Sequence, residues 1–354
     1  MLKIAALTAG TDDPASRFRI RQYILPLNCI GMEVREYCPL INIYSKIPLG
    51  RGNPKVNLFS LPFHVIWQGV KLSARISHVT GTWRNHITWL SRFLVPGHLS
   101  LEHLLKRPLV FDVDDSIWLL SPFAGYAAAS VAKRSELIIA GNDYIASWFE
   151  PHSKSIQVIP TAIDTEKYRI GDPGSSGKKE RFVIGWIGSS SNLPYLKLVE
   201  ECLRAFLFDH KDSEFLVVCD RPPLLDVFPS GQTRYIRWSE DIEVHSINQM
   251  DVGIMPLPND DWTKGKCGYK ILQYMACGKP VIASPVGVNK DILSKATLGV
   301  GATSSSDWYE AFSVYYKNAS AGEAHGRAGR DVAEQYYSLK VITNRLAGIF
   351  KGLA

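Results

Sequence analysis

Three lysines and two glycines lie close together in the C-terminal half of the sequence. They are Lys264, Gly265, Lys266, Gly268 and Lys270. They separate the apolar run 252–255, a predicted strand, from a predicted helix that begins near residue 269. Cations at the start of a helix oppose its dipole unless an anion lies between them. The spacing therefore favours a diphosphate bound at this helix start, and a solvated basic loop is the alternative.

A second candidate is the turn that follows the apolar run 182–187. It contains Gly188, Ser189 and Ser190 and precedes another predicted helix. Small residues let backbone N–H groups approach a phosphate, and a helix start favours negative charge. We predict that this turn binds phosphate. The alternative is an ordinary strand-to-helix turn capped by a polar side chain.

Three carboxylates end a predicted strand in the N-terminal half. Asp112, Asp114 and Asp115 lie at or just after the end of the apolar run 109–113. They could contact an acceptor or sugar hydroxyl, cap the next helix through Asp115, or bind a divalent metal through the Asp-x-Asp pattern. Adjacent strand residues point to opposite sides. We therefore expect only one of Asp114 and Asp115 to face a ligand, with Asp114 catalytic and Asp115 structural.

Two arginines follow the first predicted strand, residues 3–8. Arg17 lies in the polar loop after this strand and Arg19 at the start of the next helix. Either guanidinium could bind a donor phosphate or an anionic acceptor. The alternative is a solvated helix surface.

Strands and helices alternate in two blocks that would position these residues. In the first block we predict strands at 3–8, 109–113 and 137–140, a helix at 19–30, and a last segment at 158–160. In the second we predict strands at 182–188, 215–219, 252–255 and 280–284, with helices at 194–210, 244–250 and 269–277. Such alternation predicts parallel sheets whose ligands bind beyond the carboxyl ends of the strands. The fold class is therefore α/β, with two Rossmann-like domains facing a central cleft.

Composition agrees with a globular protein of this kind. The 354 residues are 46% hydrophobic and carry a net charge of +6, which permits anionic partners without requiring nucleic acid. The six cysteines include no Cys-x-x-Cys pair and no histidines at zinc spacing, so we expect reduced thiols in a cytoplasmic protein. We expect no transmembrane helix and read the first apolar run as a buried strand rather than a signal peptide.

The segment 83–94 is predicted to form an amphipathic helix. Trp83, Ile87, Leu90 and Leu94 share one face of the helical wheel, with Arg84 and Arg92 opposite. A helix that packs on the core is the favoured interpretation. An interfacial helix is the alternative, which would give the N-terminal domain a peripheral contact with the inner face of a membrane.

The run from Asp251 to Gly287 resembles the donor-site signature of the retaining GT-B glycosyltransferases of family four, the group 1 transferases. The segments 158–164 and 187–189 resemble other parts of that family, and 334–350 is similar to its terminal helix, which crosses back onto the first domain. The resemblance implies an acceptor domain at 1–168, a linker at 169–181, a donor-nucleotide domain at 182–335 and a crossing helix at 336–354. It also implies a UDP- or GDP-linked sugar donor, and no metal or cofactor. The expected reaction is retaining transfer to a glycan, lipid-linked or other hydroxyl acceptor in polysaccharide or glycoconjugate biosynthesis.

The sequence departs from the family pattern at the donor site. Gly265 and Gln273 stand where the family usually has two glutamates, and Ser189 replaces the usual arginine. The resemblance implies a ribose contact for Gln273, and the nearby lysines would neutralise the phosphates. Asp114 and Asp115 correspond to a His-Asp pair of the family's first domain. Two rivals stay open: a nucleotide-sugar epimerase, and a non-catalytic nucleotide-sugar-binding protein with a decayed donor site.

Overall fold

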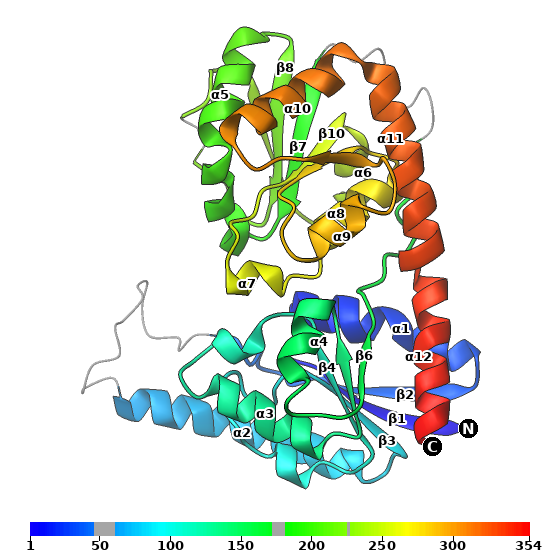
Figure 1. Cartoon of the computed structure of the whole chain (residues 1–354). Helices are drawn as coiled ribbons and strands as arrows, with labels where there is room; N and C mark the ends of the chain where they lie inside the picture. Colours follow the sequence, from blue (N-terminus) through cyan, green and yellow to red (C-terminus); the bar gives the residue numbers. More distant parts are fainter. Residues whose placement is uncertain (46–60, 172–180, 225–226) are drawn as a thin grey trace. The chain divides into compact units, whose positions relative to one another are not determined.

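The computed structural model describes residues 1–45, 61–171, 181–224 and 227–354 (Figure 1). These residues form two compact units. The first unit consists of Met1–Thr161, Gly265–Cys267 and Ile342–Ala354, and the second unit consists of Ala162–Lys264 and Gly268–Val341. Each unit is built on a six-stranded sheet, and the described strands pair in parallel throughout. The prediction of two parallel α/β blocks is confirmed.

The first unit has the strand order β2-β1-β3-β4-β5-β6. Its strands are β1 (Leu2–Leu7), β2 (Met32–Tyr37), β3 (Ile87–Ser91), β4 (Leu109–Val113), β5 (Leu137–Ala140) and β6 (Ile156–Val158). Its helices are the π-helix η1 (Ser16–Arg21), α1 (Gln22–Cys29), α2 (Leu61–Thr82), the 3₁₀ turns η2 (Glu102–Leu104) and η3 (Ile117–Leu119), α3 (Ala124–Arg134) and α4 (Asp143–Phe149).

The segment 83–94 contains a central strand, so the prediction of an amphipathic helix there is wrong. All five residues of β3 are buried, because helices cover both faces of the sheet. The ring of Trp89 lies 6.3 Å from that of Tyr23 in α1 and 5.0 Å from that of Phe350. Leu90 belongs to the core on the opposite face, with Val79 of α2. A strand buried on both faces has a nearly continuous apolar sequence, which also fits a helical wheel.

The second unit has the strand order β12-β11-β10-β7-β8-β9. Its strands are β7 (Phe182–Gly188), β8 (Ser213–Cys219), β9 (Thr233–Arg237), β10 (Val252–Met255), β11 (Val281–Ala283) and β12 (Gly299–Gly301). Its helices are the 3₁₀ helix η4 (Ser190–Leu198), α5 (Glu200–Asp209), α6 (Glu243–Asn248), α7 (Asp261–Lys264), α8 (Tyr269–Ala276), α9 (Val288–Leu293), α10 (Ser305–Lys317), α11 (Ala319–Val332) and the π-helix η5 (Ala333–Tyr337).

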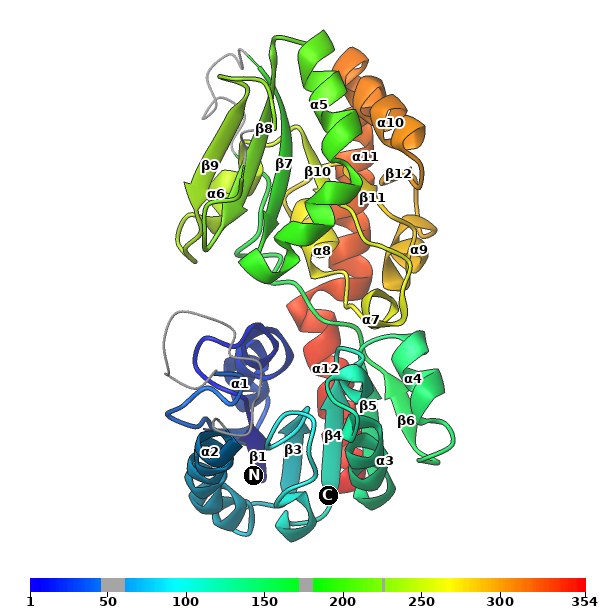
Figure 2. The same ribbon diagram turned by 90° about the vertical axis from the view of Figure 1, so that its left-hand side faces the viewer.

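Helices cover both faces of this second sheet (Figure 2). Helices α5 and α10 pack on one face through a core that includes Phe206 and Trp308. Helices α6 and α8 pack on the other face through a core that includes Ile247 and Leu272. This double cover explains why the predicted strands of the second block are continuous apolar runs.

The first unit ends at Thr161, earlier than the expected boundary at residue 168. The reason is that Ile163 and Tyr168 already belong to the core of the second unit. The last helix, α12 (Leu339–Leu353), returns the chain to the first unit from Ile342 onward. There Arg345 donates a hydrogen bond to the carbonyl of Val158 at 2.8 Å. The C-terminal helix therefore crosses back, as the resemblance implied.

The part of the chain that the structure describes contains neither a membrane-spanning helix nor a disulfide. None of its helices has the length and apolar content needed to span a membrane. All six cysteines are free thiols.

Candidate functional site

The structure brings the glycine turn and one lysine of the basic run together in the second unit. Gly188 ends β7, and Lys270 lies in the first turn of α8. A Cβ atom on Gly188 would lie 2.6 Å from Cε of Lys270 and 2.9 Å from the ring of Trp186. The Lys270 ammonium lies 5.6 Å from the centre of that ring. A side chain at 188 would therefore displace the lysine stem, which passes directly beside the Gly188 backbone.

The start of α8 has the geometry of an anion site. Its N-cap residue is Gly268, which has a φ of +67° and offers no side chain to cap the helix. A Cβ there would also meet Val288 at 2.9 Å. The left-handed conformation and the close packing both select glycine. The dipole of α8 and the charge of Lys270 thus act at one place, beside the end of β7.

The serines of the glycine turn already have partners. Ser190 donates from its backbone N–H and its hydroxyl to the Asp220 carboxylate, at 2.6 and 2.8 Å. Burial would raise the pKa of Asp220, but these hydrogen bonds outweigh it and lower the pKa. The Ser189 hydroxyl pairs with that of Ser191 at 2.8 Å and accepts from Asn192 at 2.9 Å. A phosphate that uses Ser190 must therefore displace Asp220.

The other two lysines of the basic run lie outside α8. Lys264 ends α7 and forms an ion pair with Asp261 at 3.1 Å. Lys266 lies in Gly265–Cys267, the three residues that group with the first unit. Of the three lysines, Lys270 is the one that lies within the first turn of α8. Phosphate binding by Lys264 and Lys266 stays a prediction.

Gln273 lies in a buried polar cluster. Only 4% of this residue is exposed. Its amide nitrogen donates to the carboxylate of Glu243 at 2.8 Å and lies 3.3 Å from the hydroxyl of Tyr168. Glu243 also accepts from that hydroxyl at 2.5 Å and from the Trp238 indole at 3.2 Å. The amide nitrogen is thus committed to the protein interior, and the ribose contact implied for Gln273 stays a prediction.

In the first unit, Arg19 is a buried structural cation rather than a ligand-facing or solvated one. It is 2% exposed, and its Nε donates to Asp112 at 2.9 Å. Its Nη1 donates to the carbonyl of Ile159 at 2.9 Å and to the Thr161 hydroxyl at 3.3 Å. Burial opposes its charge, but the carboxylate of Asp112 outweighs this and raises the pKa of Arg19. Arg19 therefore ties the ends of β4 and β6 to η1.

Asp114 and Asp115 are held by one arginine, Arg92, which was predicted to lie on a helix surface. Arg92 follows β3, and its Nε lies 2.7 Å from Asp114 and its Nη2 2.5 Å from Asp115. The expectation that the two carboxylates point to opposite sides is therefore wrong. The strand ends at Val113, so the alternation of side chains ends there too. Asp115 is also not a side-chain cap, because η3 begins after Ser116 and receives no side-chain capping bond.

The two carboxylates differ in exposure and in pKa. The side chain of Asp114 is 8% exposed and that of Asp115 is 19% exposed. Burial would raise the pKa of Asp114, but the charge of Arg92 outweighs it and lowers the pKa. For Asp115, burial and the negative charge of Asp114 together outweigh Arg92, so its pKa is raised. Environments that push two neighbouring pKa values apart are typical of acid–base pairs.

Arg92 has a backbone φ of +58°, which is unusual for a residue other than glycine. Such a conformation costs about 1–3 kcal/mol and is found where the surrounding structure enforces it. The two ion pairs of Arg92 supply that enforcement. If 87–91 is taken as a buried strand rather than as part of a helix, Arg92 follows its carboxyl end, next to the end of β4 and therefore near Asp114 and Asp115.

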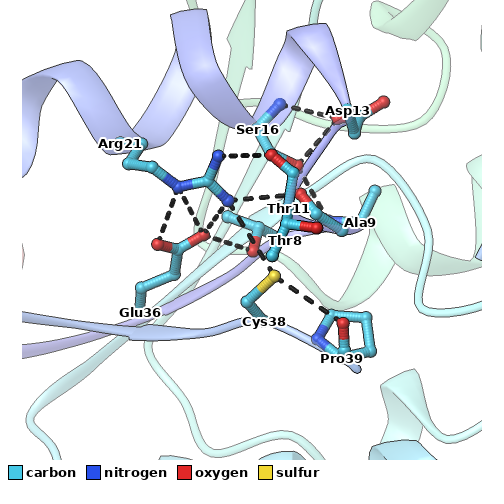
Figure 3. Close-up of polar contacts among 10 residues, drawn as sticks. Thr8, Ala9, Thr11, Asp13, Ser16, Arg21, Glu36, Cys38 and Pro39 are labelled. Carbon is cyan, nitrogen blue, oxygen red and sulfur yellow. Dashed lines mark hydrogen bonds and ion pairs between the residues drawn. The ribbon is translucent and has the colours of Figure 1, made fainter. Parts of the chain in front are cut away.

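The loop after β1 is fixed by a separate network, drawn in Figure 3. Arg21 forms a forked ion pair with Glu36 and donates to the carbonyl of Thr11 at 2.9 Å. Ser16 donates from its backbone and its hydroxyl to the carboxylate of Asp13, at 2.6 and 2.7 Å. Arg17, the other predicted ligand contact, is half-buried and lies over the Phe18 ring at 4.7 Å. A ligand contact through Arg17 stays a prediction.

A metal ion at the Asp-x-Asp motif does not fit these contacts. Asp112 accepts from Arg19 and from the Trp89 indole at 3.1 Å, while Asp114 is paired with Arg92. The carboxylates are therefore neutralised by arginines. Within the described ranges, no group of three or more His, Cys, Asp or Glu residues could hold a metal ion.

Comparison with known proteins gives a family for the second unit. Residues 181–318 match the family model described as glycosyl transferases group 1. This range includes Gly188 and Lys270. A comparison of the sequence with curated proteins finds no match.

Solved structures share the fold over the whole chain. Sucrose-phosphate synthase from Thermosynechococcus elongatus has a TM-score of 0.72 at 11% identity and covers 100% of this chain and 99% of its own. Anabaena HepE in complex with UDP-glucose has a TM-score of 0.70 at 13% identity and covers 100% of both chains. WaaG, a glycosyltransferase involved in lipopolysaccharide biosynthesis, has a TM-score of 0.68 at 14% identity and covers 99% and 100%.

The fold and the matched range together define the class: the chain is a glycosyltransferase of the GT-B fold. Its second unit belongs to the group 1 glycosyltransferases, which use nucleotide sugars.

Proposed function

We propose that this chain transfers a sugar from a UDP- or GDP-linked donor to a hydroxyl acceptor, with retention of the anomeric configuration. The acceptor would be a glycan, a lipid-linked sugar or another hydroxyl compound in surface polysaccharide or glycoconjugate synthesis. HepE, which shares the fold, was solved with UDP-glucose, and WaaG acts in lipopolysaccharide biosynthesis. These relatives motivate the donor and the pathway class.

The observation that carries the donor assignment is the contact of Lys270 with Gly188 at the start of α8. A diphosphate bound there would interact with the lysine charge, the helix dipole and the backbone of the turn. These groups would stabilise the negative charge that develops on the departing nucleoside diphosphate. Lys264 and Lys266 are proposed to add positive charge when the donor is bound.

In the first unit, we assign the acceptor role to Asp114 and Asp115. Asp115 is the more exposed carboxylate and has the raised pKa, so we propose that it orients the attacking hydroxyl and receives its proton. Asp114 and Arg92 would hold Asp115 in place. This reverses the order expected from strand alternation, in which Asp114 was the catalytic residue.

Calorimetry with UDP, GDP and the corresponding nucleosides tests the donor assignment. We expect one diphosphate to bind more tightly than its nucleoside, and the matching nucleotide sugar to release that diphosphate slowly in water. An epimerase would instead convert the sugar without releasing diphosphate. Binding without any release would favour the non-catalytic alternative. If neither diphosphate binds, the proposed donor site is wrong.

The segment 83–94 cannot bind a membrane surface as an amphipathic helix, because it contains the buried strand β3. We propose α2 instead, where Phe63, Ile66 and Val70 are 54%, 64% and 37% exposed and lie on one side of the helix. Vesicle flotation of the Ile66→Asp variant tests this. The control is Leu25→Asp, which changes an exposed leucine of α1. Equal flotation of both variants and the wild type would exclude contact through α2.

A further inference from the structure

A tyrosine with no role in the chemistry above lies next to the Arg92 cluster. Tyr44 follows β2, and its hydroxyl oxygen is buried and makes no hydrogen bond of standard geometry with a described residue, although the Arg92 guanidinium lies close enough to interact with it. Burial raises the pKa of this hydroxyl, and the positive charge of Arg92 partly offsets the rise. The negative charges of Asp13 and Asp114 also act on it. The hydroxyl therefore lies within the same electrostatic environment as the proposed acceptor carboxylates.

The backbone around Tyr44 is held in place from several sides. The Tyr44 N–H donates to the side chain of Asn42 at 2.9 Å. The ammonium of Lys71 in α2 donates to the carbonyl of Ile43 at 2.7 Å and to that of Ser45 at 2.8 Å. These bonds bracket Tyr44 on both sides along the chain. The backbone that carries the Tyr44 side chain is thus held by hydrogen bonds on both sides.

A buried hydroxyl without a partner is unfavourable, and native proteins contain few of them. The phenolic group can donate one hydrogen bond and accept another. A ligand hydroxyl can also donate one hydrogen bond and accept another. It could therefore bond to the Tyr44 hydroxyl and to a neighbouring carboxylate at the same time. The arrangement fits a polyhydroxylated ligand.

The charges around this place disfavour an anionic ligand. The cluster contains the cations Arg19, Arg92 and Lys266 and the carboxylates of Asp13, Asp112, Asp114 and Asp115. The four carboxylates outnumber the three cations, and both arginines already bind carboxylates. A phosphate or carboxylate would meet like charge here, whereas a neutral hydroxyl would meet hydrogen-bond acceptors.

We propose that Tyr44 is an acceptor-binding residue, and that the ligand it contacts beside Asp114 and Asp115 is a hydroxyl of a neutral sugar. This inference rests on the proposed function, because it specifies the acceptor class for the same site. It excludes the anionic acceptor that the arginines after β1 suggested.

Saturation-transfer NMR with methyl α-glucopyranoside and glucose 6-phosphate tests the proposal. The proteins are the wild type and the variants Tyr44→Phe and Tyr37→Phe. Tyr37 is a matched control in the same unit, because its hydroxyl donates to the Gly81 carbonyl at 3.1 Å and accepts from Asn85 at 3.3 Å. We expect the neutral glycoside to give a signal that falls about five- to tenfold in Tyr44→Phe and is kept in Tyr37→Phe.

Melting temperatures of the same variants separate ligand binding from a structural role. Tyr44→Phe removes a buried hydroxyl that makes no hydrogen bond of standard geometry, so its melting temperature should equal or exceed that of the wild type. Tyr37→Phe should melt lower. The proposal is overturned if the glycoside gives no signal, if its signal is unchanged in Tyr44→Phe, if glucose 6-phosphate gives the stronger signal, or if Tyr44→Phe melts as low as the control.

Calorimetry with UDP and GDP on the same samples keeps the two proposals apart. If the wild type binds neither diphosphate, the donor assignment fails whatever the NMR result. If a diphosphate binds to the wild type and to Tyr44→Phe alike, but the glycoside result is negative, only the Tyr44 proposal fails.

Discussion

The side chain of Gln273 donates a hydrogen bond of 2.8 Å to the carboxylate of Glu243, and both residues are buried. Group 1 transferases usually carry a glutamate at the position of Gln273, according to the resemblance described above. A glutamate there would face the carboxylate of Glu243. The amide at 273 is therefore matched to the acidic neighbour that this chain has at 243.

Gln273→Glu should lower the free energy of unfolding at neutral pH. The new carboxylate would lose the hydrogen bond and lie against a like charge, and an uncompensated buried charge costs about 3–5 kcal/mol. Adding Glu243→Gln should restore most of the stability, which urea unfolding of the two single variants and the double variant measures. Additive losses would show that the two side chains do not interact.

Gly188→Ala should weaken binding of a nucleoside diphosphate more than binding of its nucleoside. The new Cβ would force Lys270 or the Trp186 ring to move, since it would lie within 3 Å of both. Lys270→Met should have the same selectivity and cost about 1.5–3 kcal/mol of diphosphate affinity, as expected for a charged hydrogen bond. Lys211→Met, at an exposed lysine over Phe208, is the control. Equal losses for diphosphate and nucleoside in calorimetry would contradict a phosphate contact.

Asp115→Asn should lower turnover about 100-fold or more and leave stability at pH 7 unchanged or slightly higher. The pKa of Asp115 is raised in the folded protein. Its stabilising contribution is therefore present at low pH and lost as the pH rises through the folded pKa, and asparagine keeps the neutral form at all pH values. Turnover and melting temperature of the variant, measured from acid to neutral pH, check both parts. Wild-type turnover would remove Asp115 from the reaction.

Asp114→Asn should lower stability at neutral pH, in contrast to Asp115→Asn. Arg92 lowers the pKa of Asp114, so its stabilising contribution is present above the unfolded pKa of about 4 and lost as the pH falls through the lower folded value. The variant should be less stable than the wild type at neutral pH by about 1.5–3 kcal/mol. The difference should shrink in acid, which melting curves across this range would show. A difference that persists unchanged in acid would argue against the ion pair as its cause.

Arg19→Met should destabilise the first unit by about 3–5 kcal/mol, because it leaves Asp112 buried without its cation. Arg17→Met is the matched control and should change stability little, since Arg17 is only half-buried. Urea unfolding gives both values. Similar losses in the two variants would contradict the assignment of Arg19 as the buried structural partner.

EDTA should leave activity largely intact. Arginines already neutralise the carboxylates of the Asp-x-Asp motif, and Lys270 supplies positive charge at the proposed phosphate position. Release of nucleoside diphosphate from the nucleotide sugar, with and without chelator, is the measurement. Complete loss that manganese restores would instead assign a metal to the reaction.

The sequence by itself determined the fold class, because the order of strands and helices can be predicted from local patterns of apolar residues. Apolar runs such as 109–113 and 252–255 became strands with those same bounds. Glycines at chain reversals were also informative: Gly268 occupies a left-handed conformation at the start of α8. The sequence predicted phosphate binding at Gly188 and at Lys270 separately, and the structure shows that these two residues lie side by side.

Tertiary structure decided which charges are available to a ligand. Arg19 and Arg92 both looked like surface residues in the sequence, yet each lies against carboxylates from a strand distant along the chain. The same is true of Gln273, whose partner Glu243 lies on another helix. Burial and ion pairing depend on neighbours brought together by folding. A motif can therefore indicate which residue types are present, whereas only the packed structure shows which of them remain free to act.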